Sequence, residues 1–260
     1  MVAASRVARL TDQFERRFGH PPVVLGRAPG RVDLLGAHVD YNDGHILALA
    51  VDRHVWVAAD RAGRAGTTTL VALDLDEEVR FGLDRLDAGI DVDGAPLSTW
   101  ARYPAGVAWA LGELAAVGAA GRLPDIDAVV AGDVPPGAGV SSSAALEVAF
   151  AAAWLELADC RLEPLDLARA CRRAENDYVG VACGLMDQFC AVCGRRGRAL
   201  LVDCRSLEWR TLPMPRRSEL WLADTGTRRR LTEGALNDRQ RECRQAVAAL
   251  AGRIHGVSAL

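Results

Sequence analysis

Apolar residues recur at helical spacing in several parts of the chain. Val7, Leu10, Phe14 and Phe18 stand three or four positions apart and predict an amphipathic helix over residues 5–18. The same reading predicts further helices over 100–118 (broken or capped near Pro104), 143–157, 163–180 and 237–254, with a short helix beginning near 185.

Short apolar runs between turn residues predict a sheet. The runs at 23–28, 31–36 and 45–51 are separated by Pro29-Gly30 and by Asn42-Asp43-Gly44. Other strands are expected at 54–62, 67–73, 77–83 (an edge strand), 126–132, 198–204 and 218–225. Together, these helices and strands predict an α/β-type protein. The Pro-containing stretch 212–217 is the expected domain junction.

Composition narrows the functions that this pattern can carry. Half of the 260 residues are hydrophobic, and the net charge of -3 gives no field for binding nucleic acid. All 31 basic residues are Arg. The absence of Lys excludes the Gly-x-x-x-x-Gly-Lys phosphate loop and Schiff-base chemistry.

Cysteine usage and hydropathy bear on the compartment. The seven cysteines are scattered and odd in number, which indicates reduced thiols, and the lone Cys190/Cys193 pair favours buried thiols over zinc. No apolar run is long enough to span a bilayer, and the N-terminal pattern is not that of a secretion signal. We therefore expect a cytoplasmic protein without a membrane partner.

The stretch "PPGAGVSSSAAL" (135–146) places glycines and three serines directly before a helix. Glycine allows positive φ and close approach to a ligand, while the helix start presents unpaired N–H groups. Together with serine hydroxyls they form an anion cradle, for which phosphate is the obvious guest. A serine-capped helix after a tight turn explains the same letters, and the composition alone does not decide between the two.

Two further stretches concentrate polar residues among apolar ones. Residues 26–44 interleave charged and amide side chains with strand-like positions, a pattern that suits a polyhydroxylated ligand or a solvated turn. In 172–189, Glu175 is expected on a helix. Asp187, flanked by Leu185, Met186 and Phe189, should be buried, and therefore paired, functional or capping a helix.

Taken in order, these three stretches resemble the galactokinase branch of the GHMP kinases over roughly residues 20–250. "GRAPGRVDLLGAHVDYNDG" is similar to the galactokinase signature, "GDVPPGAGVSSSAALE" to the family's ATP loop, and "AENDYVGVACGLMDQF" to its catalytic segment. The resemblance implies an α+β, two-domain GHMP kinase fold. An N-terminal ribosomal-S5-domain-2-like mixed sheet with helices would occupy 1–210, and 211–260 would begin a ferredoxin-like C-terminal domain.

The resemblance also implies ATP, Mg²⁺ and a sugar as ligands. The sequence leaves the oligomeric state open and favours a monomer. The loop residues implied to bind ATP phosphates are Gly137, Ala138, Gly139, Val140, Ser141, Ser142 and Ser143, with Trp100 near adenine. Ser143 and Glu175 match the Mg²⁺ positions, and both supply the hard oxygen atoms that Mg²⁺ prefers.

Catalysis and sugar binding map onto a second set. Asp187 matches the catalytic aspartate beside the anomeric hydroxyl, and Arg31 matches the arginine that keeps it ionised and offsets transition-state charge. His38, Asp40 and Gly184 match positions around the sugar. The implied reaction is phosphorylation of the anomeric hydroxyl of a galactose-type sugar by ATP.

Three departures leave the substrate open. Ala37 stands where the family has a glutamate that receives the C6 hydroxyl, Leu236 replaces a sugar-facing tyrosine, and Asp33 replaces the usual Asn. Lost hydrogen-bond partners alter specificity strongly. A sugar with a C6 carboxylate, as in the related galacturonokinases, or a sugar without the C6 hydroxyl fits Ala37 as well.

The chain also lacks the third glycine-rich motif of the family after residue 217 and stops partway through the expected C-terminal domain. We expect a truncated product with poor solubility or activity. A catalytically weak sugar or ATP sensor, and a fold relic that binds nothing, are the alternative interpretations.

Overall fold

The computed structural model describes residues 2–114, 117–118, 121–226 and 235–259. The described strands form a mixed seven-stranded sheet in the order β4-β3-β5-β2-β6-β7, with β1 paired to β2 beside this path. Only β3 and β5 run parallel; the other pairs are antiparallel. The strands are β1 (Val24–Leu35), β2 (His45–Arg61), β3 (Thr68–Ala72), β4 (Glu77–Phe81), β5 (Ile126–Gly132), β6 (Arg198–Asp203) and β7 (Trp209–Pro213).

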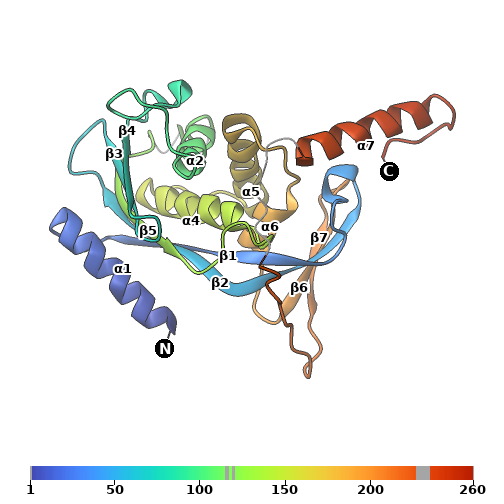
Figure 1. Ribbon diagram of the computed structural model, residues 1–260, viewed down its shortest axis with the longest axis horizontal. Coiled ribbons are helices and arrows are strands. Elements are labelled where there is room, and N and C mark those ends of the chain that lie inside the picture. The colour runs from blue at the N-terminus through green and yellow to red at the C-terminus, as the bar shows by residue number, and fades with distance from the viewer. Residues whose placement is uncertain (1, 115–116, 119–120, 227–234, 260) are drawn as a thin grey trace.

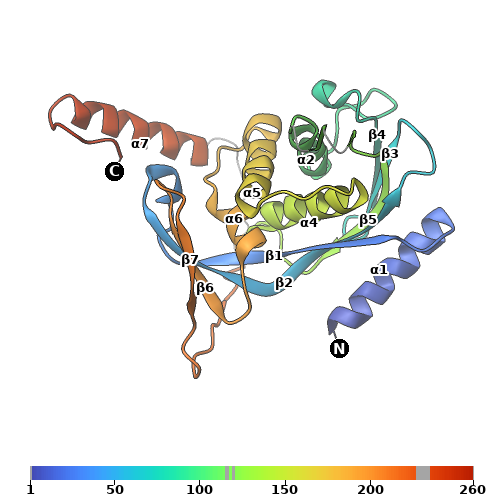
Figure 2. The ribbon, with the colours of Figure 1, turned by 180° about the vertical axis from the view of Figure 1, so that it is seen from behind.

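Helices cover both faces of this sheet (Figures 1 and 2). The α-helices are α1 (Val2–Phe18), α2 (Arg102–Gly112), α4 (Ser142–Leu157), α5 (Pro164–Arg173), α6 (Met186–Cys193) and α7 (Ala235–Ala251). A π-helical turn, η3 (Ala174–Val179), continues α5, and 3-10 turns lie at η1 (Asp40–Asn42) and η2 (Leu86–Ala88). α7 projects away from the body of the molecule.

The period of two along β2 separates two cores. Val57 and Ala59 point into the main core with α2 and α4, whereas Ala58, between them, packs with Leu10 and Phe14 of α1 on the opposite face. The amphipathic helix predicted over residues 5–18 is confirmed as part of α1, and its apolar face covers one side of the sheet.

α4 is the central helix and is apolar nearly all round. It is surrounded by β1, β2, α2, α5 and α6. Its small side chains let strands approach closely: a Cβ added to Gly26 of β1 would lie 2.3 Å from the Ala149 carbonyl oxygen. This burial explains why α4 shows no polar stripe, and it fixes the glycine-serine loop that precedes the helix.

Several sequence expectations are corrected. The runs at 23–28 and 31–36 are one strand, β1, with a register shift at Pro29/Arg31 instead of a break. The runs at 45–51 and 54–62 likewise merge into β2. The expected strand at 218–225 is wrong: these residues pair with no strand in the described part of the chain, and Trp221 is 85 % exposed. An apolar run becomes a strand only where a sheet edge is free to receive it.

The sequence analysis also missed β7. Trp209–Pro213 pairs with β6 at the edge of the sheet, where a terminal proline is tolerated. The boundary expected at 210/211 falls inside this strand. We therefore propose that the domain junction follows Pro213.

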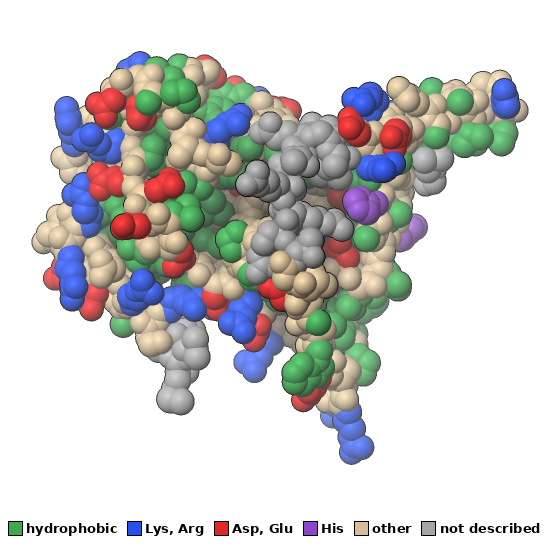
Figure 3. Space-filling model, in the orientation of Figure 1, with side chains coloured by type: hydrophobic (Ala, Val, Ile, Leu, Met, Phe, Trp, Pro, Cys, Tyr) green, Lys and Arg blue, Asp and Glu red, His purple; other side chains and the backbone are tan. Residues whose placement is uncertain are grey.

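The surface and the helices bear on the expected compartment and partners. Acidic and basic side chains are interspersed on the face shown in Figure 3, as the small net charge suggests. No helix of the described residues is long and apolar enough to cross a membrane. None of the seven cysteines forms a disulfide, and five of them are buried.

Candidate active site

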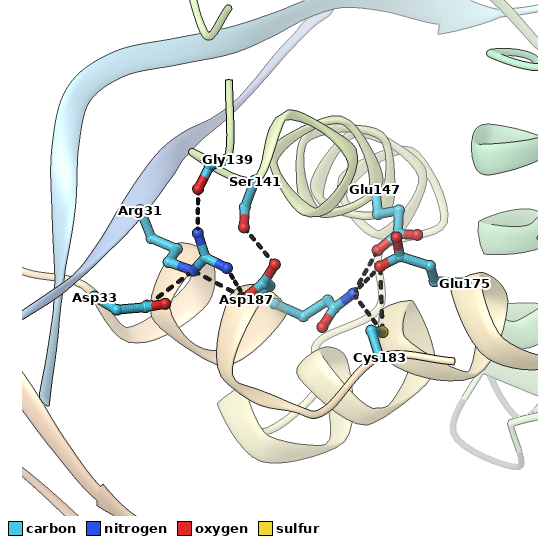
Figure 4. Close-up of polar contacts among 9 residues, drawn as sticks. Arg31, Asp33, Gly139, Ser141, Glu147, Glu175, Cys183 and Asp187 are labelled. Atoms are coloured by element: carbon cyan, nitrogen blue, oxygen red, sulfur yellow. Dashed lines mark hydrogen bonds and ion pairs between the residues drawn. The ribbon is translucent and has the colours of Figure 1, made fainter. Parts of the chain in front are cut away.

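The glycine-serine loop joins β5 to α4 in a strained backbone path. Gly137 (φ 69°), Gly139 (φ 77°) and Ser141 (φ 54°) all have positive φ. Glycine adopts this conformation freely, but at Ser141, the N-cap of α4, it costs about 1–2 kcal/mol. The Ser141 hydroxyl makes no capping bond. It donates instead to Asp187 Oδ2, so the plain serine cap is not what the structure shows (Figure 4).

Arg31 connects β1, the loop and α6. Its Nε donates to Asp187 Oδ1 at 2.8 Å, and its Nη1 donates to the Gly139 carbonyl oxygen at 2.8 Å. Asp33 Oδ1 lies 3.2 Å from the same Nε as an ion pair. The Arg31 side chain is only 12 % exposed, so the charge of the guanidinium acts on Asp187 with little screening.

The register shift in β1 makes this contact possible. Gly30 lies so close to the loop that an added Cβ would stand 2.6 Å from the Val140 carbonyl oxygen. The next residue, Arg31, donates its backbone N–H to that oxygen at 3.1 Å. β1 and the glycine-serine loop are thus joined through main-chain and side-chain hydrogen bonds.

Asp187 lies in the first turn of α6, with its side chain 22 % exposed. It is less buried than its apolar neighbours suggested, because it faces Arg31 and Ser141 at the mouth of the loop. The pKa of nearby Asp33 is raised, chiefly by burial and also by the charge of Asp187, although Arg31 opposes the shift. The pairing expected for Asp187 is present.

A second cluster of acids lies deeper, beneath the start of α4. Glu175 of η3 is 3 % exposed and Glu147 of α4 is fully buried. Gln188 Nε2 donates to Glu175 Oε2 at 2.6 Å and to Glu147 Oε2 at 3.0 Å. Neither acid forms an ion pair with any described residue, so both carboxyls are buried without a compensating cation (Figure 4).

Burial sets the charge of these two acids. It raises the pKa of Glu175 to about 7, with a further rise from the charge of Asp187, against hydrogen bonds from Cys183, Ser143 and Gln188. Burial and the proximity of Glu175 raise the pKa of Glu147 well above its usual range. At neutral pH the pair therefore carries less than two negative charges.

These contacts test whether the predicted Mg²⁺ positions suit a metal. Ser143 hydrogen-bonds Glu175, so a hydroxyl and a nearly buried carboxyl meet at the loop. No group of three or more His, Cys, Asp or Glu suited to a metal occurs among the described residues. One carboxylate and one hydroxyl fit Mg²⁺ that takes its other ligands from water and phosphate, and they do not fit an all-protein cage.

Two of the residues expected around the sugar, Asp40 and Gly184, lie near Asp187. Asp40 opens η1, and burial, with the charge of Asp187 second, raises its pKa to about 6. Gly184 packs against Asp40 so closely that a Cβ on it would collide with the carboxyl group. His38 adopts φ 65° and its Nδ1 lies 2.9 Å from the Tyr41 hydroxyl. His38, by contrast, is exposed.

The sequence also singled out Trp100, Ala37 and Leu236. Trp100 precedes α2 and donates its indole N–H to Glu77 Oε2 at 2.6 Å, not to a residue of the glycine-serine loop. Ala37 is exposed. The side chain of Leu236 lies outside the described residues, although its backbone belongs to α7.

Glu147 and Gln188 escaped the sequence analysis. Glu147 is the single charged residue among the first thirteen of the Ala-rich helix α4, and Gln188 directly follows Asp187 in an apolar segment. A lone polar residue in such a setting signals a buried, partnered group, which is how both could have been found.

Comparison with known proteins agrees with this geometry. Residues 12–61 match the galactokinase galactose-binding signature, and residues 102–195 match the N-terminal domain of the GHMP kinases. A galactokinase of Roseiflexus sp. (strain RS-1) is 40 % identical over 251 residues, which cover 96 % of this chain and 61 % of that protein. The chain is thus similar to galactokinases over nearly all of its length.

Other galactokinases give the same result. The galactokinase of Chloroflexus aurantiacus is 38 % identical over 256 residues, covering 98 % of this chain and 62 % of that protein. The crystal structure of Lactococcus lactis galactokinase complexed with galactose superposes with a TM-score of 0.78 at 26 % identity, covering 95 % of this chain and 62 % of that one. The chain thus spans about three fifths of the length of the relatives it matches.

More distant GHMP kinases share the fold alone. Methanococcus jannaschii mevalonate kinase superposes with a TM-score of 0.58 at 15 % identity over 73 % of this chain. The GHMP kinase fold expected from the sequence is confirmed.

Proposed function

We propose that this chain carries the nucleotide- and sugar-binding part of a kinase that phosphorylates the anomeric hydroxyl of a galactose-type sugar, yielding sugar 1-phosphate and ADP. The observation that carries the proposal is that Asp187 meets Arg31 and Ser141 at the mouth of the glycine-serine loop. An acid intended for the acceptor hydroxyl and a loop intended for the phosphate donor are thereby adjacent. Galactokinase relatives at about 40 % identity support the same reaction.

Each step of direct in-line transfer has residues suited to it. The positive-φ loop (Gly137, Ala138, Gly139, Val140, Ser141, Ser142, Ser143) would hold the phosphates of ATP at the start of α4. Asp187 would accept the proton of the anomeric hydroxyl as its oxygen bonds to the γ-phosphorus and the bond to ADP breaks. Arg31 would offset the charge that develops on the transferring group.

The sugar would be held by the groups on the other side of Asp187. Asp40 would supply acceptors and His38 a donor or an acceptor for sugar hydroxyls, and Gly184 leaves the Asp40 carboxyl the space that a side chain would fill. Ser143 and Glu175 would hold Mg²⁺, which supplies charge neutralisation on the phosphates when bound.

The departures at Ala37, Leu236 and Asp33 leave two alternative functions open, one with a different sugar substrate and one without efficient catalysis. Ala37 removes a carboxylate from the expected C6 side, so a uronic acid or a sugar without the C6 hydroxyl is a second candidate substrate class. Ala37 and Leu236 also suit a sensor that binds sugar or ATP with weak catalysis.

One assay separates these functions. ADP release and sugar 1-phosphate are measured with galactose, galacturonate, arabinose and N-acetylgalactosamine, alongside the shift in melting temperature caused by each sugar. Turnover of galactose supports the proposal, and preference for galacturonate or arabinose redirects it to altered C6 recognition. Thermal stabilisation without turnover of any sugar identifies a sensor. If no sugar gives turnover or thermal stabilisation, the proposal fails.

A further inference from the structure

Gln188 is a fully buried amide that immediately follows Asp187 on α6. Both amide hydrogens are used: Nε2 donates to Glu175 Oε2 at 2.6 Å and to Glu147 Oε2 at 3.0 Å. Because its environment is buried on all sides, the amide has little freedom to change rotamer. One short segment therefore directs consecutive side chains to two different groups: Asp187 to Arg31, and Gln188 to Glu175.

The contacts of Glu175 show which oxygen is held. Its Oε2 accepts from Gln188 and, at 3.3 Å, from Cys183 Sγ. These two donors hold Oε2, and Ser143 of the loop also hydrogen-bonds this carboxyl. Since no described cationic side chain pairs with Glu175, the orientation of this carboxyl depends on neutral donors, which are the Gln188 amide, Cys183 and Ser143.

We infer that Gln188 is a positioning residue, which holds the Glu175 carboxyl in the orientation that binds the cation of the nucleotide complex. This inference rests on the proposed function, because it takes Glu175 as a Mg²⁺ ligand. Outer partners of metal ligands typically change metal affinity about 10- to 100-fold when they are removed. Glu147 accepts the second amide hydrogen of Gln188 and so helps to hold the amide in this orientation.

Gln188→Met tests this role, because methionine fills a similar volume and donates no hydrogen bond. Mn²⁺ binding is titrated by electron paramagnetic resonance in the presence of a non-hydrolysable ATP analogue, using the 260-residue chain. We expect Mn²⁺ affinity to fall about tenfold or more. Affinity for the nucleotide in EDTA, which does not use Glu175, should stay within about twofold of the parent.

Two further variants separate positioning from loss of stability. Gln188→Asn keeps the amide but shortens it by one methylene, so it cannot reach both acids, and it should weaken Mn²⁺ binding even if Gln188→Met fails to fold. Thr68→Val removes a buried hydroxyl on β3, where Thr68 Oγ1 accepts from the Ile126 N–H at 3.3 Å. It should lower the melting temperature without changing Mn²⁺ affinity.

The inference is overturned if Gln188→Asn or a folded Gln188→Met binds Mn²⁺ within twofold of the parent. It is also overturned if Thr68→Val weakens Mn²⁺ binding as much, since the effect would then follow stability alone. If the parent binds nucleotide equally with and without Mn²⁺, the metal role of Glu175 falls and this inference falls with it. Galactose turnover by the parent decides the proposed function separately.

Discussion

Arg31 and Asp187 are 156 residues apart in the chain and share a hydrogen bond of 2.8 Å. Arg31 belongs to β1 and Asp187 to α6, and both reach the loop before α4 through Gly139 and Ser141. This contact brings together the two sequence segments that resemble the sugar-binding and catalytic parts of a kinase.

Replacing Asp187 by Ala should abolish phosphoryl transfer and leave nucleotide binding intact. The substitution removes the acceptor for the sugar proton, a contribution of about 10²–10⁴ in rate. Product formation and the dissociation constant of ATP, measured on the same preparation, check both parts. Retained turnover would remove Asp187 from the mechanism.

Arg31→Lys should lower kcat about 100-fold or more although the charge is kept. The planar guanidinium of Arg31 bonds Asp187 and the Gly139 carbonyl at once, and the single ammonium group of lysine cannot reproduce this geometry. The matched control is Arg17→Lys, because Arg17 also makes two bonds, but to Glu78 on the surface. That variant should keep kcat, and equal losses in both variants would argue against a catalytic role for Arg31.

Sugar binding should weaken as the pH falls through about 6. Burial raises the pKa of Asp40 to about 6, so below that pH the carboxyl is protonated and loses one acceptor for sugar hydroxyls. Sugar dissociation constants measured from pH 5 to 8 check this. Asp40→Asn should bind sugar weakly with a flat pH profile; a pH dependence that survives in Asp40→Asn belongs to another group.

The same shift has a consequence for stability of opposite sign. The folded protein holds the Asp40 proton more tightly than the unfolded chain, whose ordinary pKa is 3.8. The contribution of Asp40 to the free energy of unfolding therefore falls as the pH rises from about 4 to 6, by on the order of 1–3 kcal/mol. Urea denaturation should show Asp40→Asn more stable than the parent at pH 7 and not at pH 4.

Gly184→Ala should reduce sugar affinity at least tenfold. A Cβ at this position collides with the Asp40 carboxyl, which must move away from the sugar. Gly112→Ala is the control, because nothing lies within 4 Å of a Cβ there and it lies in α2. That change should stabilise the protein by about 0.5–1 kcal/mol. The rise in melting temperature caused by sugar is measured for both variants. Equal rises would show that Gly184 has no role in sugar binding.

The sequence by itself determined several local elements and the resemblance to galactokinases. Helical spacing at 5–18, the glycine-serine run before an apolar helix and the three ordered motifs each depend on neighbouring residues. The structure confirms these two helices, and the relatives confirm the resemblance. Hydrophobic periodicity is a local property, so the printed letters contain it.

Only the tertiary structure decided which distant groups meet. The register shift that brings Arg31 to the loop, the amide of Gln188 between two buried acids, and the pairing of β7 with β6 all depend on segments far apart in sequence. The run at 218–225 has strand-like letters and still pairs with no described strand. Burial and strand pairing depend on what surrounds a segment, and the sequence of that segment does not contain its surroundings.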